Sequence, residues 1–81
     1  MTCYTRHLDE IFKKAGVEKS YPNKQMLDRI IREILNEEGE GKGHGSCGEI
    51  FKIVRQRLFV EKDRDFENRI VQRFVKAALL G

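Results

Sequence analysis

Apolar side chains recur every three or four residues along most of the chain, which is the spacing of one face of an α-helix. The first stretch with this spacing is followed by Gly16, and glycine readily adopts the left-handed conformation that ends a helix. We therefore expect a first helix that ends near Ala15. Its apolar stripe consists of Tyr4, Leu8, Ile11, Phe12 and Ala15.

The second stretch runs from about Pro22 to Glu37 and has the clearest helical pattern. Proline has a fixed backbone angle that suits the first turn of a helix. Adjacent apolar residues then recur once per turn, as expected of a helix that faces a core. These residues are Met26, Leu27, Ile30, Ile31, Ile34 and Leu35.

Two more helices are predicted in the C-terminal half. Ser46 and Glu49 have the spacing of a capping box, in which each side chain accepts a hydrogen bond from the other residue's backbone N–H. Asp63 is a good N-cap for a fourth helix. The apolar residues of the third helix are Ile50, Phe51, Ile53, Val54 and Leu58, and those of the fourth are Phe66, Ile70, Val71, Phe74, Val75 and Ala78.

The end of the fourth helix, residues 77–80, reads Ala-Ala-Leu-Leu and is unusually apolar for a terminus. Such an end either docks on its own domain or binds a partner. It therefore predicts a protein partner or self-association as a homodimer.

Residues 39–48 read GEGKGHGSCG, which predicts a flexible loop between the second and third helices. The chain has 81 residues, too few for two cores. No apolar run approaches the roughly 20 residues that span a bilayer, and the N-terminus lacks the pattern of a signal peptide. We expect a single all-α domain over residues 1–81, a compact bundle of four helices with a glycine-rich loop between helices two and three.

All cysteine and histidine residues fall into two close pairs, Cys3 with His7 and His44 with Cys47. Zinc binds thiolate and imidazole ligands in tetrahedral sites. If the first helix starts at Thr2, Cys3 and His7 lie one turn apart on one face. The glycine loop would let the second pair meet the first, so the four residues form a candidate structural zinc site.

The same residues have simpler explanations. Cysteine is often buried, and both cysteines border apolar stripes. If Thr5 caps the first helix instead, Cys3 lies outside it and the pair loses its helical spacing. Separately, His44 lies between two glycines and can simply be an exposed loop residue. Cys3, His7 and Cys47 are therefore the firmer candidate ligands.

The redox setting and catalysis also depend on these cysteines. Two cysteines without a secretion signal indicate a reducing, cytoplasmic setting, so we expect no structural disulfide between Cys3 and Cys47. A nucleophilic Cys47 at a helix start, with His44 or His7 as base, is a third option. It lacks an orienting Asn or Asp, and we expect no enzyme activity.

Two glycine motifs do not indicate nucleotide binding. Residues 43–48 match G-x-G-x-x-G, but a dinucleotide site needs a preceding strand, and here a helix precedes the motif. Lys42 is followed by glycine, so the segment is not a P-loop. Backbone N–H groups at the start of the third helix, with Lys42 nearby, could still hold a phosphate or sulfate.

Net positive charge is concentrated in the C-terminal half, where residues 41–81 carry nine Lys and Arg against five Asp and Glu. Basic residues on a helix could contact the phosphates and bases of a nucleic acid. Interspersed acids such as Glu61 and Asp65 weaken this reading, and a solvated mixed-charge face is the alternative. The candidate nucleic-acid-binding residues are Lys52, Arg55, Arg57, Arg69, Arg73 and Lys76.

The segments CYTRHLDEIFKKAGV and NKQMLDRIIREIL, together with Cys47 at a helix start, resemble a small group of uncharacterised prokaryotic helical proteins. The resemblance covers about the first two-thirds of the chain. It implies a helical fold and no particular activity. The sequence as a whole predicts a non-enzymatic binding or protein-interaction domain with a candidate zinc site, and a nucleic-acid-binding protein is the alternative.

Overall fold

The computed structural model describes residues 8–39, 41 and 43–80, the last without its side chain. These residues contain no strand, so the predicted all-α bundle of four helices is confirmed, with one π-helical turn added. None of the described helices is long and apolar enough to cross a membrane. The elements are α1 (Asp9–Ala15), α2 (Tyr21–Glu38), α3 (Cys47–Arg55), the π-helix η2 (Gln56–Val60) and α4 (Arg64–Leu80).

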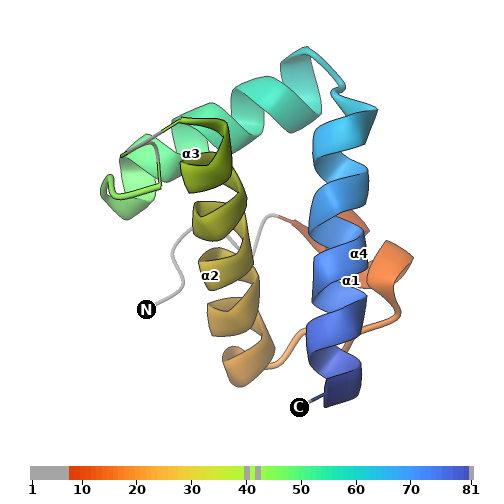
Figure 1. Cartoon of the computed structure of the whole chain (residues 1–81). Helices are drawn as coiled ribbons and strands as arrows, with labels where there is room; N and C mark the ends of the chain where they lie inside the picture. Colours follow the sequence, from red (N-terminus) through yellow and green to blue (C-terminus); the bar gives the residue numbers. More distant parts are fainter. Residues whose placement is uncertain (1–7, 40, 42, 81) are drawn as a thin grey trace.

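The two long helices, α2 and α4, form the centre of the bundle (Figure 1). They lie side by side and run in opposite directions, while α3 crosses near the end of α2 at the top of the view. Helix α1 packs against α4, and η2 connects α3 to the start of α4. Helices α1, α2 and η2 therefore pack against α4, and α3 is joined to it through η2.

The core lies between these helices and contains the apolar residues that the helical spacing identified. Phe12 of α1 packs edge-to-face against Phe74 of α4, with ring centroids 5.3 Å apart. This pair joins α1, the shortest of the four α-helices, to the centre of the bundle by a favourable aromatic contact. The buried apolar residues are Leu8, Ile11, Phe12, Leu27, Ile30, Ile31, Ile34, Leu35, Ile50, Val54, Phe66, Ile70 and Phe74.

Three predicted helix ends are confirmed. Gly16 ends α1 in the left-handed conformation, with φ 67°. Ser46 Oγ accepts a hydrogen bond from the Glu49 N–H at 3.3 Å, which caps the start of α3. Asp63 Oδ1 accepts one from the Phe66 N–H at 3.1 Å, which caps the start of α4.

The start of the first helix differs from both predicted positions. Helix α1 begins at Asp9, because Leu8 has φ −106° and ψ 41° and lies outside the helical region. The N-cap residue of this helix is Leu8, with no side-chain cap hydrogen bond. The helical spacing expected between Cys3 and His7 is therefore not supplied by α1, and both residues lie outside the described part of the chain.

The glycine-rich loop was predicted to be flexible, but α2 side chains hold its middle in place. The Arg32 guanidinium donates to the carbonyls of Gly43 and Gly45, at 3.2 and 2.6 Å. The Asn36 side-chain oxygen accepts from the Gly43 N–H at 2.8 Å. Because Gly43 packs directly on α2, a Cβ atom there would lie 2.1 Å from the Arg32 carbonyl oxygen.

This contact predicts opposite effects for two glycine substitutions. Gly43→Ala should destabilise the fold by about 1–3 kcal/mol, because the loop must move off α2 and lose its hydrogen bonds. Gly48→Ala is the matched control, since a Cβ there meets nothing within 4 Å and alanine favours the first turn of α3 by up to about 1 kcal/mol. Urea unfolding followed by circular dichroism measures both, and equal effects of the two substitutions would contradict this account of the loop.

Candidate binding groove between α1, η2 and α4

The predicted zinc ligands are only partly described by the structure. His44 is exposed in the glycine loop, and Cys47 is the half-buried first residue of α3. Cys3 and His7 lie outside the described residues. Within the described residues, no three His, Cys, Asp or Glu side chains gather in a way that could hold a metal ion.

The state of Cys47 corrects one expectation. Cys47 is disulfide-bonded, whereas the sequence predicted free thiols in a reducing setting. That prediction used the cellular compartment, but a disulfide also depends on whether the fold brings two sulfurs within bonding distance. In this state Cys47 offers no thiolate, so it is neither a zinc ligand nor a nucleophile unless the protein is reduced.

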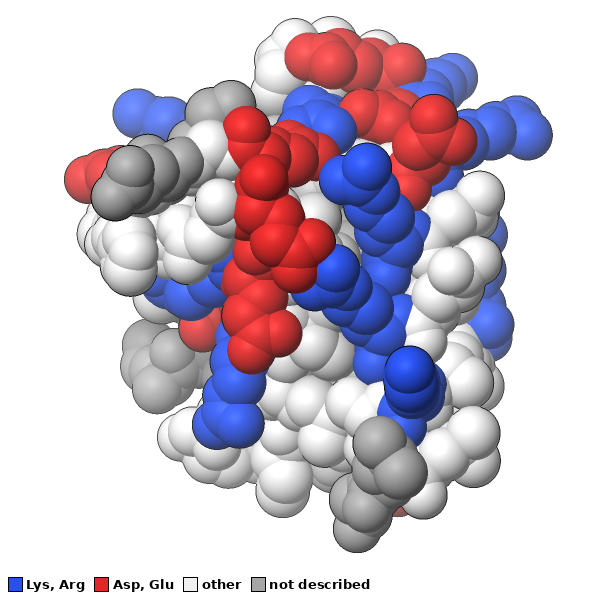
Figure 2. Space-filling view, in the orientation of Figure 1, with Lys and Arg blue, Asp and Glu red and all other residues white. Residues whose placement is uncertain are grey.

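Three of the six basic residues predicted to contact nucleic acid are bound within the protein. Arg73 forms two hydrogen bonds with Glu37, at 2.6 and 2.5 Å, and Arg69 lies 3.5 Å from Glu38. Figure 2 shows the resulting pattern, in which acidic side chains on α2 face basic side chains on α4. Arg57 is the third residue and also contacts Glu38. The other three, Lys52, Arg55 and Lys76, are exposed and make no ion pair with a described residue.

The sequence did not predict the π-helical turn that follows α3. The Glu61 N–H donates to the Gln56 carbonyl at 2.8 Å, a bond that spans five residues instead of four. The wider turn leaves Leu58 half-buried against the core but directs Phe59 and Val60 outward, at 48% and 63% exposure. Such turns occur often at functional sites.

Arg57 fixes this turn by contacts on several sides. Its Nη1 and Nη2 atoms lie 2.6 and 3.1 Å from the two carboxylate oxygens of Glu38 at the end of α2. Its Nε donates to Asp63 Oδ2 at 2.9 Å. The guanidinium carbon lies 4.3 Å from the centre of the Phe66 ring, a cation–π distance. One side chain thus joins α2, η2 and the start of α4.

The network shifts the pKa values of its members in the directions expected of ion pairs. The hydrogen bond to Glu38 is the main cause that raises the pKa of Arg57. The pKa of Asp63 is lowered first by the Phe66 N–H and then by Arg57. On the α2–α4 face, the hydrogen bond from Arg73 lowers the pKa of Glu37. These carboxylates are therefore ionised and paired at neutral pH.

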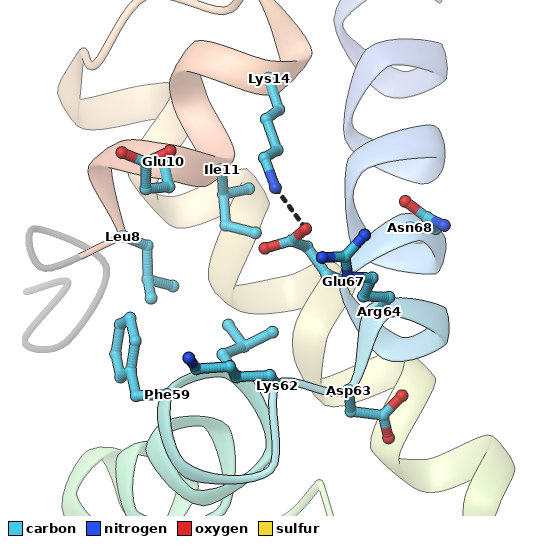
Figure 3. Close-up of a pocket in the computed structure, with 11 residues that line it drawn as sticks. Leu8, Glu10, Ile11, Lys14, Phe59, Lys62, Asp63, Arg64, Glu67 and Asn68 are labelled. Atoms are coloured by element: carbon cyan, nitrogen blue, oxygen red, sulfur yellow. Dashed lines mark hydrogen bonds and ion pairs between the residues drawn. The ribbon is translucent and has the colours of Figure 1, made fainter.

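A groove of about 520 Å³ lies between α1, η2 and the start of α4 (Figure 3). Ile11 of α1 and the preceding Leu8 line one side of it, and Leu58 and Phe59 line it from η2. Its volume falls in the range of known ligand sites. The apolar lining and the exposed ring of Phe59 make it the strongest candidate binding site among the described residues.

Charged side chains surround this apolar lining. Lys14 of α1 and Glu67 of α4 form an ion pair of 2.5 Å across the groove. Lys62 lies in the turn between η2 and α4, and Arg64 is the first residue of α4; neither forms an ion pair with a described residue. Glu10, on α1, is the unpaired acid of the rim.

Sequence reasoning missed the groove because its residues come from three separate elements. A local signal was present, since Leu58, Phe59 and Val60 form a run of three apolar residues that breaks the helical spacing. At least one member of such a run must point away from the core. The structure shows that two of them do.

The contacts of Arg57 predict a loss of stability on substitution. Arg57→Met keeps the apolar stem over Phe66 but removes the hydrogen bonds to Glu38 and Asp63, and should lower the free energy of unfolding by about 2 kcal/mol. Arg57→Lys should be only slightly more stable than Arg57→Met, because an ammonium group cannot bind two carboxylates and a ring in this arrangement. Arg55→Met, at the exposed neighbouring arginine, is the control and should stay within about 0.5 kcal/mol in the same urea titration.

The lowered pKa values of Glu37 and Asp63 predict acid-dependent stability. Because both are lower in the folded than in the unfolded state, the unfolded chain binds more protons as pH falls, and stability is lost. The loss should begin near the ordinary values of 4.5 for Glu37 and 3.8 for Asp63 and continue below them. Asp63→Asn should flatten this dependence in unfolding experiments at several pH values, and a profile that superimposes on the wild type would contradict the assignment.

Comparison of the chain with protein-family models, with curated proteins and with solved structures gives no significant match. The predicted resemblance to uncharacterised prokaryotic helical proteins therefore stays a prediction. Any functional argument rests on the residues of the groove itself.

Proposed function

We propose that this chain is a non-enzymatic protein-interaction domain that binds its partner in the groove between α1, η2 and α4. The observation that carries the proposal is the position of Phe59, a large aromatic side chain that is 48% exposed at a groove whose lining also includes Leu8, Ile11 and Leu58. Aromatic residues next to apolar pockets often dominate the energy of protein interfaces.

The way Phe59 is held supports a binding role over incidental exposure. A regular helical turn would distribute Leu58, Phe59 and Val60 differently, but η2 is fixed by the hydrogen bonds of Arg57. Lys62, just after η2, has φ 52°, a strained value for a residue other than glycine. Strained backbone held by surrounding contacts tends to occur at binding and catalytic sites.

The earlier candidates have weaker support. The nucleic-acid alternative loses Arg57, Arg69 and Arg73 to internal ion pairs, which leaves three dispersed cations. The zinc site from Cys3, His7, His44 and Cys47 stays a prediction and requires a reduced Cys47. A cytoplasmic location and self-association also stay predictions, the latter supported by Leu79 at 82% exposure near the end of α4.

The proposal is tested by selecting peptides against the folded domain and mapping where they bind. Peptides from a random display library should shift the amide resonances of groove residues and lose at least about tenfold in affinity with Phe59→Ser. Val60→Ser is the matched control, because Val60 is exposed on the same turn but does not line the groove.

Both substitutions replace partly exposed side chains, so the domain should remain folded in circular dichroism spectra. Peptides that bind Phe59→Ser as tightly as wild type, or that shift resonances away from the groove, would contradict the proposed site.

A further inference from the structure

We infer that the partner of this groove is an acidic amphipathic peptide segment, with one bulky apolar side chain in the groove and carboxylates against Lys62 and Arg64. The inference rests on the proposed function and adds the chemical class of the partner. It follows from which charges at the rim are already neutralised and which are not.

Of the six charged residues that line the groove, three are paired within the protein. Lys14 is bound to Glu67, and Asp63 is bound to Arg57. Among the described residues that line the groove, the charged ones without an ion-pair partner are Lys62, Arg64 and Glu10. Two cations against one anion leave the rim with a positive balance that a negatively charged ligand would satisfy.

The unpaired charges are also separated by sign. Lys62 and Arg64 flank Asp63 at the start of α4, and Figure 3 shows the Lys62 chain extended toward Phe59. Glu10 lies on α1, on the far side of Leu8 and Ile11 in that view. A bound segment would therefore lie with its carboxylates toward the η2–α4 turn and away from the α1 rim.

Lys62 and Arg64 both occupy backbone positions that normally favour other residue types. Arg64 is the first residue of α4, where the helix dipole disfavours a positive side chain. Lys62 has a left-handed φ of 52°, where glycine or asparagine is the normal choice. Residues that break local rules without a structural gain are expected at functional positions.

The shape of the site favours a peptide over a small anion. The apolar lining comes from two sides of the groove, from Leu8 and Ile11 on one side and from Leu58 and Phe59 of η2 on the other. An amphipathic helix can place one apolar side chain against Phe59 and acidic residues one turn away on the same face. A free anion would bind Lys62 and Arg64 but would leave the apolar lining of the groove exposed to water.

The experiment uses two synthetic amphipathic peptides of about four helical turns that share the same leucine positions. One carries glutamate at its polar positions and the other carries lysine. Binding is measured by fluorescence anisotropy, and the contacted residues are identified from amide chemical shifts. The glutamate peptide should bind at least about tenfold more tightly, with shifts at Phe59, Lys62 and Arg64 and weaker binding at high salt.

Charge variants separate the groove from the overall charge of the protein. The double variant Lys62→Glu, Arg64→Glu should weaken the glutamate peptide at least about tenfold. The double variant Lys52→Glu, Lys76→Glu changes the net charge equally at exposed positions outside the groove, and should change affinity less than about threefold. Glu10→Gln should strengthen binding, which no purely structural role predicts.

Three other results would contradict the inference, the proposed function, or both. Equal or tighter groove binding by the lysine peptide would overturn the acidic class but leave the groove as a binding site. Equal losses in the two double variants would assign the binding to net charge and overturn the inference. If neither peptide shifts groove resonances, both the inference and the proposed function are wrong.

Discussion

The contacts of Arg57 are the constraint on which the rest of the described structure depends. Glu38 ends α2 and Asp63 begins α4, and one guanidinium binds both carboxylates while it stacks on Phe66. Only arginine combines several fixed donors with a flat face that packs on an aromatic ring. Because Arg57 is the second residue of η2, the same contacts that close the bundle also set the π-helical turn. The outward position of Phe59 is thus a consequence of how the helices are joined.

Local patterns in the sequence predicted most of the fold. Apolar spacing found the four helices, and Gly16, Ser46 and Asp63 marked three helix ends correctly, because these signals act within one or two turns of the chain. The π-helical turn could not be predicted in this way. Its extra residue is stabilised by Glu38, which lies 19 positions from Arg57, and periodicity does not report contacts at that separation.

The candidate sites were predicted less well for the same physical reason. Basic residues on α4 resembled a nucleic-acid surface while that helix was considered alone, but Glu37 lies 36 positions from Arg73 and neutralises it. Cys47 was placed correctly at the start of α3, yet its disulfide depends on a second sulfur that α3 does not carry. Residue type and local spacing identify candidate chemistry, whereas the partner of each group is decided by tertiary packing.

The pairing of charges also indicates which part of the protein surface can bind a charged ligand. An arginine bound to glutamate within the protein gains little from an external anion, because the internal pair must first be broken. On the α2–α4 face, an external anion would have to compete with Glu37 and Glu38 for Arg73 and Arg69. Lys62 and Arg64 can bind an external anion without first breaking an internal ion pair, since neither has a partner among the described residues. They also stand beside the exposed Phe59, so charge and apolar area are available together at this one groove. A ligand that offers both carboxylates and an apolar side chain gains from each, which is why the groove favours an acidic amphipathic segment over a nucleic acid.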